Sequence, residues 1–173
     1  MASGVYNVGK KWFLDNDVAT EITTTGSVWL LLMKPVTPTF TATRTNVTGV
    51  VTTDSNTECD FTGNSTDYVT NGLQLTVGGA TSGPVTATVV ADQTDNKGEV
   101  RADVDVIWDT AGGTVSNDVS CALLYAAATP ATPSKAADIP LIFWDMTPLT
   151  LNGGDLTFNW GQDATPNRII ISI

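Results

Sequence analysis

SCALLY at residues 120–125 is the first of four apolar stretches that decide the fold of this chain. It is followed by IPLIFWDM at 139–146, DLTFNW at 155–160 and RIIISI at 168–173. Each stretch is short, rich in β-branched or aromatic residues and bounded by turn residues, as is typical of strands in a core. The last third of the chain therefore predicts four core strands.

Further strands are predicted upstream. Residues 28–33 (VWLLLM) show no polar alternation, which is expected of a strand covered on both faces. Residues 73–77 alternate between apolar and polar, and residues 85–91 form another apolar run. The polar sequence DQTDNKG at 92–98 then predicts a hairpin connection to the next strand.

The clearest alternation lies in residues 99–108, which predict one continuous strand. Its apolar face consists of Val100, Ala102, Val104, Val106 and Trp108. Its polar face consists of Glu99, Arg101, Asp103 and Asp105, and only Ile107 breaks that series. We expect the polar face to be solvated, since charged residues are mostly exposed.

Eight or so closely spaced strands, with no long helical pattern, predict an all-β fold. Such a pattern favours an antiparallel β-sandwich or a jelly-roll-like barrel. A length of 173 residues favours a single domain over residues 1–173, large enough to bury a core without disulfides or metals.

Three segments stand apart from the predicted strands. In the N-terminal segment, residues 1–26, residues 8–17 predict a short helix whose Trp12, Phe13 and Leu14 form an apolar plug docked on a sheet. Residues 39–63 predict a long loop with at most short strands near 48–52. Residues 126–138 contain two prolines and predict an exposed, partly extended loop. Long loops often carry function, so residues 39–63 are the leading candidate for partner contact, with a merely tolerated excursion as the alternative.

The charge balance argues against nucleic acid as a direct partner. Eight basic and eighteen acidic residues give a net charge of −10, and the basic residues are scattered along the chain. Nucleic-acid binding needs a basic patch that displaces counterions. No apolar run reaches the length of a signal peptide core or a membrane span, so we predict neither secretion nor a membrane partner.

The two cysteines, Cys59 and Cys121, carry no metal-ligand spacing. Two small buried hydrophobic side chains are expected, with a disulfide bridge as the alternative.

The sequence contains no histidine. This excludes Ser-His-Asp and Cys-His nucleophilic devices in their usual form, and His-ligated zinc. Carboxylates are left as the main chemical groups. Asp103 and Asp105 lie on one face of one predicted strand, with Asp109 beyond it, whereas a glycoside hydrolase needs two carboxylates facing each other across a sugar. We therefore predict no enzyme and no catalytic residue.

Two acidic clusters bear on metal binding. Asp92, Asp95, Asn96 and Glu99 surround Gly98, but the helix-loop-helix calcium pattern fails because Gln93 and Lys97 would fall at ligand positions. A non-standard calcium site is the alternative there, and also at Asp15, Asn16 and Asp17. We predict no metal site and no cofactor.

Two other motifs have simple structural interpretations. Gly153 and Gly154 match neither phosphate-loop fingerprint and predict a turn. The five tryptophans could form a sugar-stacking platform, but four lie in or beside apolar runs, which favours core packing.

The order of the motifs along the chain resembles that of small virion structural proteins of tailed bacteriophages. These motifs are GKKWFL, VWLLLM, YVTNGLQLTV, GEVRADVDVIWD, SCALLY, IPLIFWDM, LNGGDLTFNWG and IIISI. The resemblance covers most of the chain and is most specific from Leu73 onward. Its motifs are structural, so it implies no active-site residue.

The resemblance implies a capsid decoration or cement protein on the capsid exterior, made in the host cytoplasm. Such a protein binds the major capsid protein and stabilises the lattice through many weak contacts. A homotrimer or homodimer is expected, with the N-terminal segment and the long loops as contact surfaces. The alternative is a neck, tail or fibre-associated module that binds tail proteins or a host-surface glycan.

Overall fold

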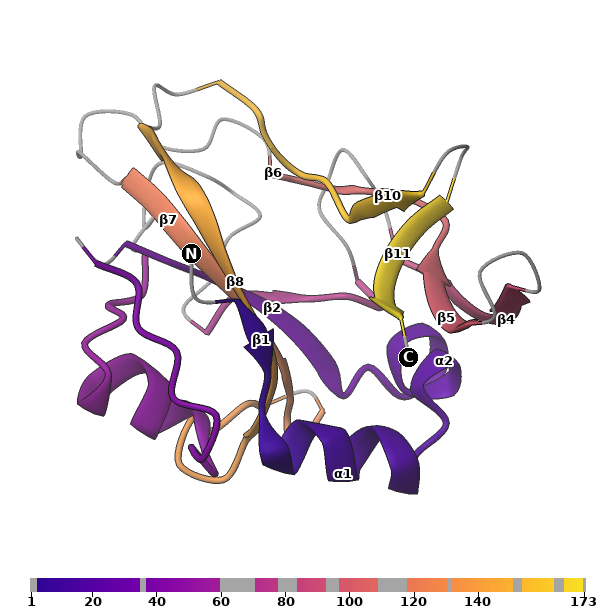
Figure 1. The fold of residues 1–173 in the computed structure, drawn as a ribbon, viewed down its shortest axis with the longest axis horizontal. Helices are drawn as coiled ribbons and strands as arrows, with labels where there is room; N and C mark the ends of the chain where they lie inside the picture. The colour runs from indigo at the N-terminus through magenta and orange to yellow at the C-terminus, as the bar shows by residue number, and fades with distance from the viewer. Residues whose placement is uncertain are drawn as a thin grey trace.

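The computed structural model consists mostly of strands in antiparallel sheets, with a few short helices (Figure 1). This confirms the predicted all-β class. The structure describes residues 3–34, 37–59, 71–77, 84–92, 97–108, 118–130, 132–150, 154–163 and 167–172.

A five-stranded antiparallel sheet forms the centre. Its strands run in the order β1 (Gly4–Val5), β8 (Ile139–Thr150), β7 (Asp118–Ala126), β2 (Val28–Met33) and β3 (Leu73–Gln74). All six residues of β2 are buried, which confirms a strand covered on both faces. β7 and β8 confirm two of the predicted C-terminal strands, although β8 continues beyond Met146 to Thr150.

Two smaller sheets accompany the central one. The four-stranded sheet has the order β10 (Gly161–Asp163), β11 (Asn167–Ser172), β5 (Lys97–Ala102) and β4 (Ala87–Asp92). The two-stranded sheet pairs β6 (Val106–Trp108) with β9 (Leu156–Phe158). β9 and β11 confirm the last two predicted strands. β4 and β5 pair from Ala87↔Ala102 to Asp92↔Lys97, which confirms the predicted hairpin; its residues 93–96 lie outside the described part.

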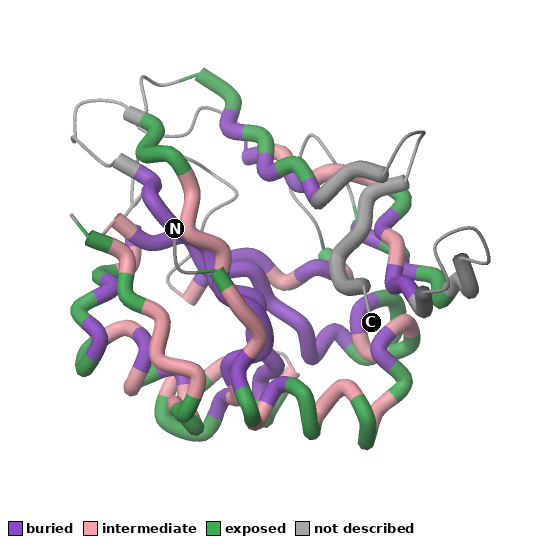
Figure 2. Tube along the Cα trace, in the orientation of Figure 1, coloured by how far each residue is buried: buried purple, intermediate pink, exposed green. Residues whose placement is uncertain are grey.

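The central sheet separates two hydrophobic cores. Figure 2 shows that buried residues are concentrated in the middle of the molecule. Val28, Leu30 and Leu32 of β2 face the first core, which also contains buried residues of β4, β5, β6 and β9. Trp29, Leu31 and Met33 face the second core on the opposite side. Successive side chains of β2 therefore pack into two different cores, because both faces of this strand are covered.

The second core is covered by residues 37–59. Most of the described residues 39–59 of the predicted long loop have no regular secondary structure, but the segment packs onto the sheet. Val47 and Val50 are fully buried there. Gly49–Thr53 forms a helical turn, η2, in place of the short strand expected near 48–52. The reason is that Val47, Val50 and Val51 recur at helical spacing and pack against the sheet.

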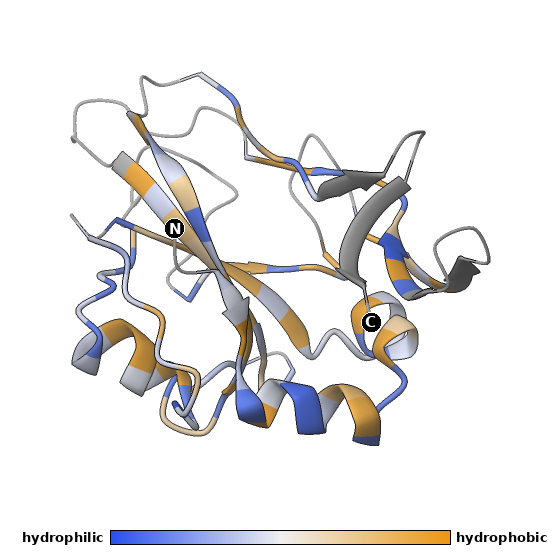
Figure 3. Cartoon of the chain, viewed as in Figure 1, coloured by the Kyte–Doolittle hydropathy of each residue, from blue (hydrophilic) through white to orange (hydrophobic). Residues whose placement is uncertain are grey.

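The predicted N-terminal helix is confirmed as α1 (Asn7–Asp15). Trp12 and Phe13 pack against the first core, but Leu14 is 84% exposed, so the predicted apolar plug lacks its third member. Figure 3 shows hydrophilic residues along the middle of this helix. A short helix, α2 (Val18–Thr20), and a helical turn, η1 (Glu21–Thr25), lead into β2.

The prediction of one continuous strand over residues 99–108 is wrong, because the chain leaves β5 after Ala102 and re-enters a different sheet at Val106. Val100, Ala102, Val106 and Trp108 are buried as expected, but Glu99 is buried too, at 1% exposure. Residues 73–77 form a strand only at Leu73–Gln74, and Val77 is 64% exposed.

Candidate functional site

The loop at residues 126–138 is exposed or partly exposed over most of its described residues, as predicted, but both of its ends are fixed onto the sheet. Its first residue, Ala126, still belongs to β7, and Asp138 at its end is fully buried. The Oδ1 atom of Asp138 accepts a hydrogen bond from the backbone N–H of Ala128 at 3.0 Å. The N–H of Asp138 donates to the carbonyl of Ser134 at 3.0 Å. Burial raises the pKa of the Asp138 carboxyl above its usual range.

Backbone hydrogen bonds join this loop to the cover formed by residues 37–59. The N–H of Val47 donates to the carbonyl of Asp138 at 3.1 Å, and that of Thr48 donates to the carbonyl of Lys135 at 2.9 Å. The Lys135 ammonium forms an ion pair with Glu58 in the same cover. The two segments therefore form one connected surface over the second core.

Tyr125 and Trp29 lie in the second core, beneath that surface. Their rings stack with centroids 6.4 Å apart. The Tyr125 hydroxyl donates to the carbonyl of Asn71 at 2.6 Å, and the Trp29 indole N–H donates to the carbonyl of Pro130 at 3.0 Å. Burial raises the pKa of Tyr125, so this hydroxyl is a permanent donor at neutral pH.

A second polar cluster connects the cover to the N-terminal segment. Asp54 is buried, and its Oδ1 atom accepts hydrogen bonds from Arg44 Nε at 2.9 Å and from the Thr41 hydroxyl at 3.0 Å. The fully buried Tyr6 is close enough for the Asp54 charge to raise its pKa, although burial is the larger cause. The Tyr6 ring also packs edge-on against Phe40 of the cover, with centroids 4.9 Å apart, so the N-terminal segment contacts the cover beside this cluster.

The carboxylates of Asp103 and Asp105 accept backbone hydrogen bonds from two different segments. The Oδ1 atom of Asp103 accepts the backbone N–H of Thr86 at 2.8 Å. The Oδ1 atom of Asp105 accepts the backbone N–H of Trp160 at 3.3 Å. The two carboxylates thus connect the segment between β5 and β6 to two different parts of the chain. Asp109 lies outside the described residues.

The acidic cluster at residues 15–17 also serves the backbone and its own helix. Asp17 caps α2 by accepting the N–H and the hydroxyl of Thr20, while Asp15 pairs with Lys11. The Asn16 side chain donates to the carbonyl of Trp12 at 2.9 Å. Among the described residues, no group of three or more His, Cys, Asp or Glu side chains could hold a metal ion.

The second acidic cluster is only partly described. Glu99 is paired with Arg101 at 2.7 Å, and Asp95 and Asn96 lie outside the described residues. The same holds for Gly153 of the predicted glycine turn.

The tryptophans pack into the cores, as predicted. Trp29, Trp108 and Trp160 are buried, and Trp144 packs edge-on against Trp160 with ring centroids 6.1 Å apart. Trp12 is partly buried against the first core. These positions do not make an exposed sugar-stacking platform.

Cys59 and Cys121 are buried and not joined by a disulfide, so the expectation of two small core side chains holds. Cys59 belongs to the first core and Cys121 to the second. Burial raises the pKa of Cys121 to about 12.

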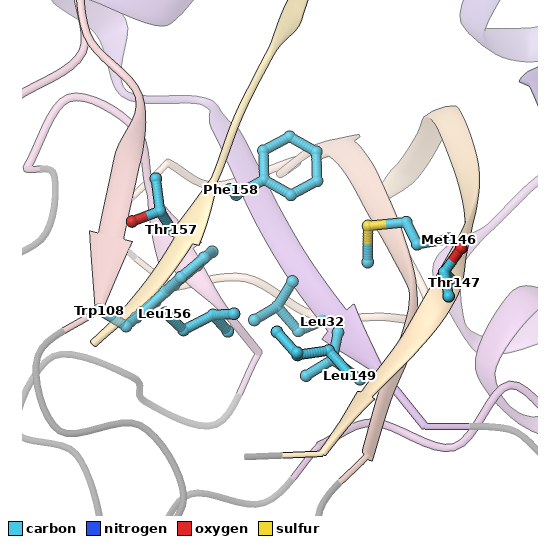
Figure 4. Close-up of a pocket in the computed structure, with 9 residues that line it drawn as sticks. Leu32, Trp108, Met146, Thr147, Leu149, Leu156, Thr157 and Phe158 are labelled. Atoms are coloured by element: carbon cyan, nitrogen blue, oxygen red, sulfur yellow. The ribbon is translucent and has the colours of Figure 1, made fainter. Parts of the chain in front are cut away.

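An apolar pocket of about 110 Å³ lies between the central sheet and the two-stranded sheet (Figure 4). Leu32, Met146 and Leu149 line it from the central sheet, and Trp108, Leu156 and Phe158 line it from β6 and β9. Thr147 and Thr157 supply its polar atoms, and none of its lining residues is charged. A space of this size and chemistry matches one aliphatic side chain or a small apolar molecule.

No protein-family model, curated protein or solved structure matches this chain. None of the helices in the described part is long and apolar enough to cross a membrane.

Proposed function

We propose that this chain is a non-enzymatic structural protein of a bacteriophage particle, and that it decorates the outer surface of the major capsid lattice. The proposal starts from the order of the sequence motifs. One structural observation supports it further: the acidic side chains that were candidates for chemistry accept hydrogen bonds from the chain's own backbone and side chains. They are Asp17, Asp54, Asp103, Asp105 and Asp138.

This use of carboxylates suits a protein whose task is to hold a shape. Each one joins segments of the chain at a turn or beneath a cover, so the surface loops are fixed before any partner binds. A preorganised surface loses less conformational entropy on binding than a loose one. The finer fold that we propose is an antiparallel β-sandwich or jelly roll, with the first core between its sheets.

The surface over the second core is the proposed contact with the capsid. It combines the N-terminal segment, the cover at residues 37–59 and the loop at residues 126–138. The Asn7 N–H, which donates to the carbonyl of Ala42 at 3.0 Å, and the Lys135–Glu58 ion pair tie these segments together. Its outer positions Thr52, Thr53, Ser134 and Ala136 are exposed and uncharged. Many copies of one modest contact of this kind sum to a strong effect on the lattice.

The experiment is to add the purified protein to capsids assembled without it, and then to count bound copies in a map of the particles. We expect many copies spread over the shell, together with a higher temperature of capsid disruption. A few copies at the neck or tail would contradict decoration and support the tail-module alternative. No binding to any part of the particle would contradict a virion role.

A further inference from the structure

Strand β4 is the longest edge strand in the part of the chain that the structure describes. The other sheet edges are short: β1 and β3 have two residues each, and β6, β9 and β10 have three each. The long strand β8 is covered over its middle residues, because β1 pairs with it at Ile142 and Phe143 and the Ser3 hydroxyl accepts the N–H of Asp145 at 2.8 Å. Edge strands with unpaired backbone groups are templates for pairing with another chain.

The register shows which backbone groups of β4 point outward. Asp103 N–H donates to the carbonyl of Thr86, so Thr86 bonds toward β5, and by alternation so do Thr88 and Val90. Ala87, Val89 and Ala91 then direct their N–H and C=O groups to the outer edge. The Thr23 hydroxyl confirms this direction, because it accepts the N–H of Ala87 at 2.9 Å.

The outer edge is apolar beyond the position that Thr23 covers. Val89 is 65% exposed, although it lies on the same side of the sheet as the buried Ala87. No residue from 85 to 91 is charged, and Asp92 is the first acidic residue. In a chain with a net charge of −10, an uncharged edge is where a second copy can approach with the least repulsion.

We propose that two copies of this chain associate through antiparallel pairing of their β4 strands about a two-fold axis at Val90. This places Val89 opposite the partner's Ala91, and Ala91 opposite the partner's Val89. All four residues then exchange backbone hydrogen bonds, because their outward groups face each other. The result is a continuous sheet of eight strands, four from each copy. The contact is self-complementary, as a two-fold interface must be.

Charge placement supports this register over others. Asp92 pairs with Lys97, and Thr88 pairs with Arg101. In the proposed dimer Asp92 stands opposite the partner's Thr88, which is uncharged. Acidic residues do not face each other directly. This inference deepens the proposed function and rests on it for the expectation of self-association. A dimer is one of the two oligomers that the sequence resemblance implies.

The sharpest test is cysteine cross-linking of the full chain. Val90→Cys places two thiols opposite each other at a non-hydrogen-bonded pair, where Cβ atoms are about 4.5–5.5 Å apart. Mild oxidation should convert most of this variant to a covalent dimer. Thr88→Cys is the matched control: its thiols are displaced along the strands and should not cross-link. Equal cross-linking of both variants, or none of Val90→Cys, would overturn the pairing.

A second test measures the mass in solution by light scattering. Val89→Lys should raise the dimer dissociation constant by about tenfold or more, since lysine on an edge strand blocks pairing. Val77→Lys is the control, because Val77 is equally exposed, at 64%, and lies outside β4. A wild-type monomer or trimer would overturn the inference. Because capsid binding is measured separately, capsids that bind a monomeric protein would leave the proposed function standing.

Discussion

Helix α1 and strand β8 meet backbone to backbone at Gly9 and Leu141. A Cβ atom at Gly9 would lie 2.7 Å from the Leu141 carbonyl oxygen and 2.8 Å from its Cα. No side chain fits at that distance, so glycine alone allows the helix to lie this close to the sheet. The contact places the N-terminal segment, which is part of the proposed capsid-binding surface, on the edge of the central sheet.

Gly9→Ala should therefore destabilise the protein by about 1–3 kcal/mol, the usual cost of overpacking a close contact. Urea denaturation followed by tryptophan fluorescence measures this loss. Gly49→Ala is the matched control, since its Cβ would meet mainly the flexible Arg44 side chain, 3.1 Å away. Its stability should change by less than about 1 kcal/mol. Equal stability of the two variants would show that α1 does not depend on the close contact.

The cysteines provide a test of both cores. Cys59 and Cys121 are buried on opposite faces of the central sheet, and the pKa of Cys121 is raised to about 12 by burial. The reactive thiolate is therefore scarce at neutral pH. We expect slow reaction with a thiol reagent in the folded protein and two reactive thiols per chain in denaturant. A denatured, unreduced chain without reactive thiols would reveal a disulfide and contradict this packing.

We expect the Asp103 carboxylate to stabilise the fold, and substitution of this residue tests that role. Asp103→Ala removes the acceptor of the Thr86 N–H and should cost about 1 kcal/mol, a typical net value for one hydrogen bond. Asp103→Asn retains a side-chain oxygen and should recover most of that stability. Thermal unfolding of the two variants measures the difference. If asparagine were as damaging as alanine, the negative charge rather than the acceptor would matter at this position.

The central strands were predictable because their signal is local. The runs in β2 and β7 are so apolar that only a buried position suits them, and α1 follows helical spacing. The break after Ala102 was not predictable, since the alternation continues unchanged through Asp103 and Asp105 while the chain changes sheets. The acceptors that hold this break are the carboxylates of Asp103 and Asp105, which receive the N–H groups of Thr86 and Trp160. In the sequence both aspartates look like part of an ordinary solvated face.

The cover over the second core was also hidden in the sequence. Only Val47 and Val50 within it are fully buried hydrophobic residues, and the surrounding Thr and Asn residues mask their spacing. Its attachment depends on contacts between distant segments, such as Lys135 with Glu58. No sequence pattern within either segment predicts such a pair. The candidate contact surface could therefore be located roughly from loop length, but its internal order could not.

Asp138 gives a prediction about pH. Its pKa in the folded protein is raised above the ordinary value of 3.8, with burial as the largest cause. The folded state therefore binds the proton more tightly than the unfolded state does. Its contribution to stability is fully present below pH 3.8 and is lost as the pH rises through the raised pKa. Asp138→Asn removes this titration while retaining an oxygen for the Ala128 N–H.

We expect the free energy of unfolding of the wild type, relative to Asp138→Asn, to fall as the pH is raised from about 4 to 7. Urea denaturation of both proteins at each pH measures the difference and cancels the titration of other groups. Tyr125, Glu58 and Lys135 are the same in both proteins, so their contributions cancel in this difference. A difference that stays constant with pH would show that the Asp138 carboxylate is not penalised by its burial. A difference that rises with pH would show that the carboxylate is held by stronger partners than the Ala128 N–H.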